Sequence, residues 1–150
     1  MKITFSKAAP AAGVALVVPV FEDGAATSAH KALDEASTGA LGRAVKAANF
    51  GGKKGQTLDL VGLAGHEDAR VIMVGAGKRG EFAPLDAEAV GGAGIAPLLK
   101  TQEKAAAFLL DGFQTDAVGA GETAARVALG ALLRRYRFDK YRTRLEKDQK

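Results

Sequence analysis

The sequence predicts an α/β fold, a three-layer sandwich in which helices flank a mixed, mostly parallel β-sheet. Segments of strand and helix character alternate along the chain, which is typical of parallel strands joined by helices. Residues 14–21 and 70–74 are almost wholly apolar, as expected of strands that are buried on both faces. The 150 residues include 47% hydrophobic residues and no cysteine. This composition fits one domain with its own core and excludes a disordered segment or a disulfide scaffold.

Five short stretches are predicted to be strands because they are apolar or alternate between apolar and polar residues. Short turns, such as the polar one at Gly65–Asp68, join some of them. We therefore expect a mixed sheet rather than a strictly doubly wound one. The five strands are Lys2–Ser6, Val14–Phe21, Thr57–Leu63, Arg70–Val74 and Ala105–Leu110.

Two helices are predicted between these strands. Residues Leu33–Ala48 carry leucine and alanine at three- and four-residue intervals on one face. The second helix begins near Pro84, a favoured first helical position, and runs towards Lys100 with a kink at Pro97. Its glycines would let it press closely against a strand or a neighbouring chain. They are Gly91, Gly92 and Gly94.

The last predicted helix spans Gly121–Tyr136 and carries an apolar stripe, typical of a helix that covers a sheet. The stripe consists of Ala125, Leu129, Leu132 and Tyr136.

The charge is concentrated at the C-terminal end. The chain has 21 Lys and Arg against 17 Asp and Glu, but residues 134–150 alone hold eight basic and three acidic residues. We interpret residues 1–133 as the folded domain and 134–150 as a basic linker helix. Its basic and aromatic residues suit contact with single-stranded nucleic acid or with another domain. The candidate contact residues are Arg134, Arg135, Arg137, Lys140 and Arg142.

The N-terminus imitates a secretory signal, because Lys2 and Lys7 precede a run of apolar residues. Pro10 and Pro19 interrupt that run, and no apolar segment approaches the roughly 20 residues of a membrane span. We therefore expect a cytoplasmic protein with no membrane contact.

Two glycine-rich segments resemble phosphate-binding loops. Residues Gly75–Gly80 form a literal G-x-G-x-x-G after a strand, but the helix that should begin within the motif begins only near Pro84. Residues Phe50–Thr57 precede a strand and lack the helix that would supply a dipole. Both are interpreted as connecting loops, so we expect no cofactor-binding residue in this chain.

No catalytic centre can be recognised. The two histidines, His30 and His66, have no partner at ligand spacing, and the serines have no G-x-S-x-G context. Asp86 and Glu88 are predicted in the first turn of the second helix, where carboxylates favour the positive end of the dipole. We expect no catalytic and no metal-binding residue in the chain.

Three stretches, in order and spacing as well as in sequence, resemble the N-terminal domain of the leucyl aminopeptidase family. They are Phe50–Gly55, Arg70–Lys78 and Ala128–Tyr141, the last with the pattern G-x-x-L-x-x-Y-x-F-D-x-Y. The resemblance covers essentially the whole chain and implies a macro-domain-like fold.

The resemblance also implies a parent enzyme, a cytosolic hexamer that removes N-terminal residues from peptides with two divalent ions, Zn or Mn. The family's metal ligands and its Asn-Thr-Asp-Ala-Glu-Gly-Arg signature belong to a C-terminal domain, and this signature is absent here. The chain is thus expected to be a non-catalytic assembly or regulatory domain. Its expected partners are its own catalytic domain, further copies in a hexamer and, as in some bacterial members, DNA.

Two alternative functions stay open from the sequence. The domain could act alone as a nucleic-acid-binding module through its basic C-terminal residues, or as a macro-like nucleotide-binding module through Gly75–Gly80.

Overall fold

The computed structural model describes residues 3, 5, 14–22, 28–63, 66–101 and 105–148. For residues 28–29, 66–69 and 137–148 it describes the backbone alone.

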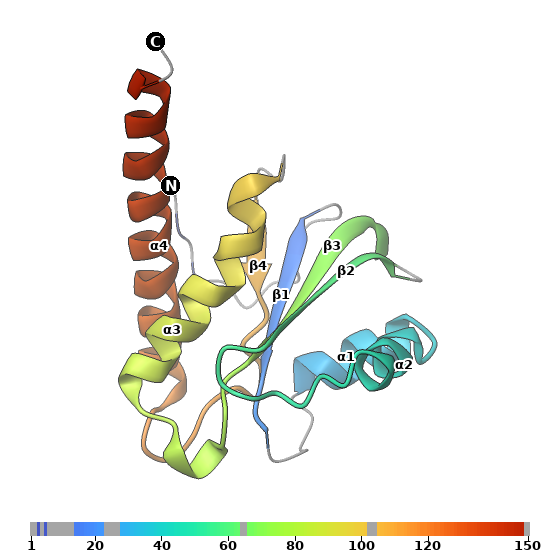
Figure 1. The fold of residues 1–150 in the computed structure, drawn as a ribbon. Helices are drawn as coiled ribbons and strands as arrows, with labels where there is room; N and C mark the ends of the chain where they lie inside the picture. Colours follow the sequence, from blue (N-terminus) through green and yellow to red (C-terminus); the bar gives the residue numbers. More distant parts are fainter. Residues whose placement is uncertain are drawn as a thin grey trace.

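A four-stranded sheet forms the centre of the fold, in the order β2-β3-β1-β4 (Figure 1). β1 (Ala15–Val20) lies between β3 (His66–Gly75) and β4 (Ala106–Phe108) and is parallel to both. β2 (Thr57–Leu63) is antiparallel to β3. The predicted mixed, mostly parallel sheet is confirmed.

Helices cover both faces of the sheet (Figure 1). On one face lie α1 (Ser28–Ala36) and α2 (Ala40–Ala47), and on the other lie α3 (Pro84–Ile95) and α4 (Ala120–Asp148). Short 3₁₀ segments, η1 (Arg79–Glu81) and η2 (Ala96–Lys100), flank α3. The three-layer architecture predicted from the sequence is therefore present.

Alternate side chains of the central strand supply the two halves of the core. All six residues of β1 are buried. Val17 packs in the half that faces α3 and α4, whereas Val18 packs in the half that faces α1 and α2. A strand covered on both faces needs apolar side chains at every position, which explains the unbroken apolar run in the sequence.

The predicted helix over Leu33–Ala48 is two helices rather than one. Thr38 and Gly39 between them have φ angles of 55° and 80°, which no α-helix accommodates. The buried Ser37 hydroxyl donates to the Asp34 carbonyl oxygen and accepts from the Leu41 N–H, so it closes the first helix and caps the second. The apolar periodicity runs through this break, so it gave no sign of it.

The strand ends also differ from the prediction. β3 begins at His66, which pairs with Leu63, so the turn predicted at Gly65–Asp68 is wrong for residues 66–68. β4 is shorter than the predicted Ala105–Leu110. Of the predicted strand Lys2–Ser6, only positions 3 and 5 are described and neither is in a strand. The rest of it lies outside the described residues.

α4 buries a different face from the predicted stripe and continues past Tyr136 to Asp148. The side chains that face the core are small or medium-sized, whereas the predicted stripe is exposed to solvent. Buried are Thr123, Val127, Gly130 and Ala131. Exposed are Ala125, Leu129, Leu132 and Tyr136.

The backbones of α3 and α4 approach closely, which explains why α4 buries its face of small and medium-sized residues. A Cβ atom added at Gly91 would overlap the Val127 carbonyl oxygen, and one added at Gly130 would overlap the Glu88 carbonyl oxygen. Because the two backbones touch, leucine cannot occupy the contact. The predicted approach of the second helix to a strand is confirmed at Gly94, whose added Cβ would lie 2.7 Å from Val17 Cγ1 of β1.

The helix contact predicts opposite effects at two neighbouring glycines. Gly91→Ala should lower the free energy of unfolding by about 2 kcal/mol or more, because α4 must shift to admit a methyl group. Gly92→Ala should raise it by up to about 1 kcal/mol, because its Cβ would meet Gly130 O at an ordinary 3.6 Å and alanine favours the helix. Urea denaturation of both variants measures the difference. Equal stability of the two variants would contradict the contact.

Candidate functional site

The candidate site lies at the edge of the sheet where the parallel strands β1 and β3 have their carboxyl ends. This is the edge at which open α/β sheets usually bind ligands. Three segments meet there: the loop 50–56 before β2, the glycine-rich segment 75–77 after β3 and the first turn of α3. We call these three segments the carboxyl-edge cluster.

The lack of side chains at the glycines of the G-x-G-x-x-G motif lets neighbouring loops approach closely. A Cβ at Gly75 would overlap the Lys53 carbonyl oxygen, and Gly77 has a φ of 83°. The Gly75 N–H donates to Gln56 O at 2.7 Å, the Ala76 N–H to Val20 O and the Gly77 N–H to Gly52 O, both at 2.9 Å. Amides that would face a pyrophosphate in a dinucleotide site are thus bound to this chain's own carbonyls.

The loop 50–56 is fixed by one amide side chain. Gln56 Oε1 accepts from the Gly51 N–H at 2.9 Å and from the Lys53 N–H at 3.3 Å, and Gln56 Nε2 donates to Asn49 O. Gly52, with a φ of 79°, lies so close to Phe21 that an added Cβ would be 2.7 Å from the Phe21 carbonyl oxygen. The loop therefore packs against the end of β1 as a fixed element.

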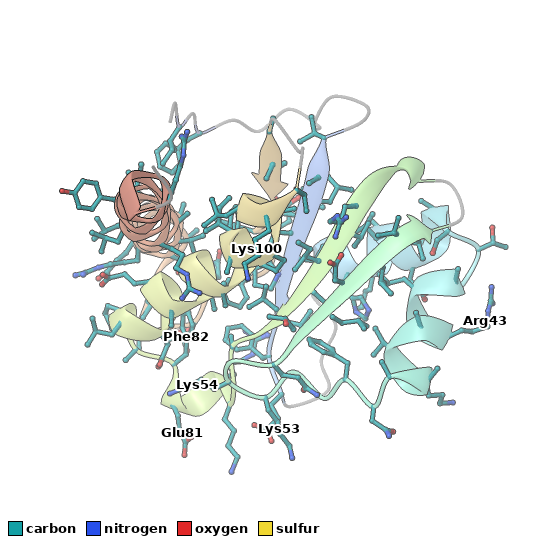
Figure 2. The ribbon with its side chains drawn as sticks, turned by 45° about the horizontal axis from the view of Figure 1, so that its top comes forward. Arg43, Lys53, Lys54, Glu81, Phe82 and Lys100 are labelled. Atoms are coloured by element: carbon teal, nitrogen blue, oxygen red, sulfur yellow. The ribbon has the colours of Figure 1, made fainter. Side chains whose placement is uncertain are left out.

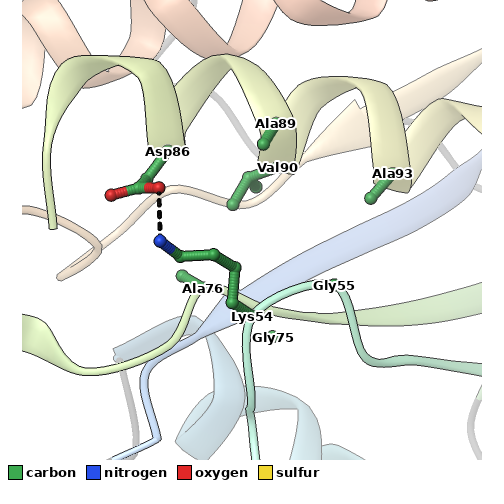
Figure 3. A pocket seen from close by; sticks show the side chains of 8 residues that line it. All are labelled: Lys54, Gly55, Gly75, Ala76, Asp86, Ala89, Val90 and Ala93. Atoms are coloured by element: carbon green, nitrogen blue, oxygen red, sulfur yellow. Dashed lines mark ion pairs between the residues drawn. The ribbon is translucent and has the colours of Figure 1, made fainter.

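An ion pair joins this loop to α3. Lys54 Nζ lies 2.9 Å from Asp86 Oδ1, and the other Asp86 oxygen accepts the Ala83 N–H at the helix start (Figure 3). The expected role of Asp86 at the positive end of the helix is confirmed. Glu88 instead pairs with Arg126 of α4 at 2.9 Å.

The ion pair shifts the pKa of both partners. Burial alone would raise the pKa of Asp86, but the hydrogen bonds from Lys54 and the Ala83 N–H outweigh burial and hold the pKa below its ordinary value. The same hydrogen bond and charge raise the pKa of Lys54. Both groups are therefore charged at neutral pH.

A small cavity of about 70 Å³ lies behind the ion pair, between the loop and α3 (Figure 3). Apart from Lys54 and Asp86, its lining is glycine and apolar side chains, among them Val90 and Ala93. This volume has room for one or two water molecules and is far below the few hundred Å³ of a ligand pocket.

Three phenylalanine rings pack against one another next to the carboxyl-edge cluster. The rings of Phe21, Phe82 and Phe113 lie 4.7–5.3 Å apart in stacked and edge-on pairs. The Arg79 guanidinium covers the Phe21 ring at 4.3 Å and donates to the Gln114 carbonyl oxygen at 2.9 Å. Lys53, Lys54 and Glu81 gather at the same end of the molecule (Figure 2). Arg79 of the G-x-G-x-x-G segment thus contacts Phe21 and the Gln114 carbonyl, and these contacts stabilise the loops.

The basic residues predicted to contact nucleic acid or another domain are distributed along α4. The Arg134 side chain is exposed and that of Arg135 is partly buried. The side chains of Arg137, Lys140 and Arg142 lie outside the described residues, although the helix backbone continues through all three positions.

The histidine and carboxylate side chains of the described residues do not gather into a metal-binding group. His30 is half-buried beside Asp34; burial lowers the pKa of His30 and the Asp34 charge partly opposes this. The side chain of His66 lies outside the described residues. Within the described part of the chain, no three His, Cys, Asp or Glu side chains are grouped as a metal site would require.

Sequence reasoning missed both long-range ion pairs of this region. Lys54 and Asp86 are 32 positions apart, and Glu88 and Arg126 are 38 positions apart. Neither pair has a local spacing signal. Only the placement of α3 over the end of β3, and of α4 against α3, brings these charges together.

The Lys54–Asp86 pair predicts a pH-dependent stability difference. Asp86→Asn should lower the free energy of unfolding by about 1 kcal/mol at pH 7, because the charged acceptor is lost. The folded-state pKa of Asp86 is lowered, so its contribution is present above about pH 4. The difference between the two proteins should therefore begin to shrink below about pH 4 and disappear once the pH falls below the lowered folded-state pKa of Asp86.

Urea titrations at pH 7 and pH 3 provide the measurement, with Lys54→Met and the double variant as a cycle. If the pair acts as a unit, Asp86→Asn should cost little in the Lys54→Met background. Full additivity, or an undiminished difference at pH 3, would contradict the assignment.

No helix in the described part of the chain is both long enough and apolar enough to cross a membrane.

Comparisons with known proteins place the chain in a family. The profile described as "Cytosol aminopeptidase family, N-terminal domain" matches residues 17–145. A probable cytosol aminopeptidase of Caulobacter vibrioides is 40% identical over 152 residues, which cover all of this chain, and one of Rhizobium etli is 39% identical over 150 residues, which cover 99% of it. In both cases the match spans only 29% of the relative's length.

The fold comparison agrees. A solved structure of a tomato leucine aminopeptidase mutant superposes with a TM-score of 0.65 at 24% sequence identity, covering 82% of this chain and 25% of the tomato chain. At this identity the likeness concerns the fold alone. Among the helices and strands, the profile match omits only the first two residues of β1 and the last three of α4. Together with it, these comparisons show that the chain belongs to the cytosol aminopeptidase family, of which it is the N-terminal domain.

Proposed function

We propose that this chain is the non-catalytic assembly or regulatory domain of a two-metal leucyl aminopeptidase that removes N-terminal residues from peptides. The supporting observation is that a domain matched along its whole length spans only 29% of its aminopeptidase relatives. Catalysis in the proposed enzyme belongs to the remaining length, in a C-terminal domain.

The metal chemistry of the proposed enzyme does not fit the residues of this domain. Two divalent ions, Zn or Mn, would need several carboxylate or histidine ligands grouped together. The described residues hold no such group, and Asp86 and Glu88 are already paired with Lys54 and Arg126. We therefore assign both ions to the C-terminal domain.

The proposed partners are the catalytic domain of the same chain and further copies of the protein in a hexamer, in the cytoplasm. α4 supports the first of these partners. Its buried residues, from Thr123 to Ala131, pack in the core, and the same helix continues to Asp148, so it would lead from this domain to the catalytic domain of the proposed enzyme.

This function predicts a clear division of activity. The 150-residue chain should release no leucine from a leucyl amide substrate with added Mn²⁺ or Zn²⁺, because its described residues hold no group of metal ligands. The longer protein from the same gene should release leucine under identical conditions. Leucine release by the pure short chain that a chelator abolishes would contradict the proposal.

Nucleic-acid binding is the second candidate function. It is supported by the basic residues from Arg134 to Arg142, which α4 presents on a helix that extends beyond α3 (Figure 1). A helix of this kind brings several cations to a phosphate backbone without disturbing the domain.

If five cations contact a single strand, affinity should fall about 100-fold between 50 and 200 mM salt. Fluorescence anisotropy with a labelled single-stranded oligonucleotide measures this. Replacing Arg134, Arg135, Arg137, Lys140 and Arg142 with glutamine should reduce both the affinity and its salt dependence. A matched control replaces Lys31 and Lys46, which lie on the opposite face of the sheet. An affinity that does not change with salt would exclude phosphate contacts.

A further inference from the structure

The face of α4 that points away from the domain is apolar. Leu129 and Leu132 are each 40% exposed, Leu133 is 44% exposed and Tyr136 is 67% exposed. Their spacing places all four within an arc of about 100°, opposite the arc of Val127 and Ala131 that packs on α3. We call these four residues the outer stripe. A helix with apolar residues on two opposite faces is typical of one that is covered on both sides.

Among the described residues, the buried core on this side of the sheet does not include the outer stripe. The core on this side is completed by α3 and by the small residues of α4, and the α3 contact leaves no room for leucine at Gly130. Four large apolar side chains on one helix face oppose solubility unless something covers them. In the described part of the chain these side chains are covered only in part and stay 40–67% exposed.

We propose that the outer stripe is the docking surface for the polypeptide that follows α4 in the longer protein, through an apolar patch on that following domain. The inference rests on the proposed function, because it requires that the longer protein exists. The relatives are more than three times as long as this chain, and α4 is its last helix. The domain that follows is therefore joined to the same helix that carries the stripe.

The size of the stripe favours this occupant over a second copy of the chain. Stable association of free proteins usually buries about 1,600 Å² in total, and four side chains on one helix supply only a fraction of that area. A covalently joined domain meets the stripe at a high effective concentration and needs far less area. From Tyr136 to Asp148 the helix rises only about 18 Å, so the following domain can fold back onto the stripe.

Thiol labelling can test the proposal because the chain contains no cysteine. Leu132→Cys places a reporter in the outer stripe. Val61→Cys is the matched control, since Val61 is 71% exposed on the edge strand β2, at the other side of the sheet from α4 (Figure 1). Each variant is made in the 150-residue chain and in the longer protein from the same gene. Maleimide labelling rates at these two sites are followed by peptide mass spectrometry.

Both positions should label rapidly in the short chain. In the longer protein, labelling at position 132 should slow about tenfold or more, while labelling at position 61 stays unchanged. A rate at position 132 that remains within about twofold of the rate at position 61 would overturn the proposal. So would protection of position 132 in the short chain that increases with protein concentration, because that result identifies a second copy as the occupant.

The proposed function and the docking surface can be contradicted separately. If the longer protein hydrolyses leucyl amide but position 132 stays reactive, the docking surface is wrong and the proposed function stands. If the gene yields only the 150-residue chain, the proposed function and this inference are both overturned.

Discussion

The contact between the backbones of α3 and α4 is the constraint on which this half of the molecule depends. Gly91 and Gly130 remove the side chains that would otherwise hold the two helices apart. The close approach brings Glu88 within 2.9 Å of Arg126 and admits only small and medium side chains to the buried face of α4. The large apolar residues of the helix are consequently exposed on its outer face. The packing of α4 on α3 thus determines which apolar side chains of α4 are exposed.

A second set of close backbone contacts closes the carboxyl edge of the sheet. Gly52 packs on the Phe21 carbonyl and Gly75 on the Lys53 carbonyl, so the loops before β2 and after β3 lie against each other. Their amides bond to carbonyls of the same loops, and Asp86 occupies the start of α3. An edge that often binds ligands in α/β proteins is here filled by the protein's own groups.

The structure could be predicted from the sequence where a local pattern determines it, and could not where tertiary packing determines it. The bounds of β2 and the start of α3 at Pro84 were predicted as observed, because alternation and a proline at the first helical position are local signals. The break at Thr38 and Gly39 was missed, because apolar spacing continues through it. The buried face of α4 was chosen wrongly, because hydrophobicity favours leucine whereas a contact between backbones requires glycine. The pair of Lys54 and Asp86 depends on tertiary structure alone.

α4 is one continuous helix from Ala120 to Asp148, and this continuity bears on the proposed function. A flexible linker would leave a following domain free to take any orientation. Here the helix that contacts α3 through Gly130 is the same helix that continues to Asp148, so the direction in which the chain leaves the domain is fixed by the α3 contact. In the proposed enzyme, a change that alters how α4 crosses α3 would therefore be transmitted to the position of the catalytic domain.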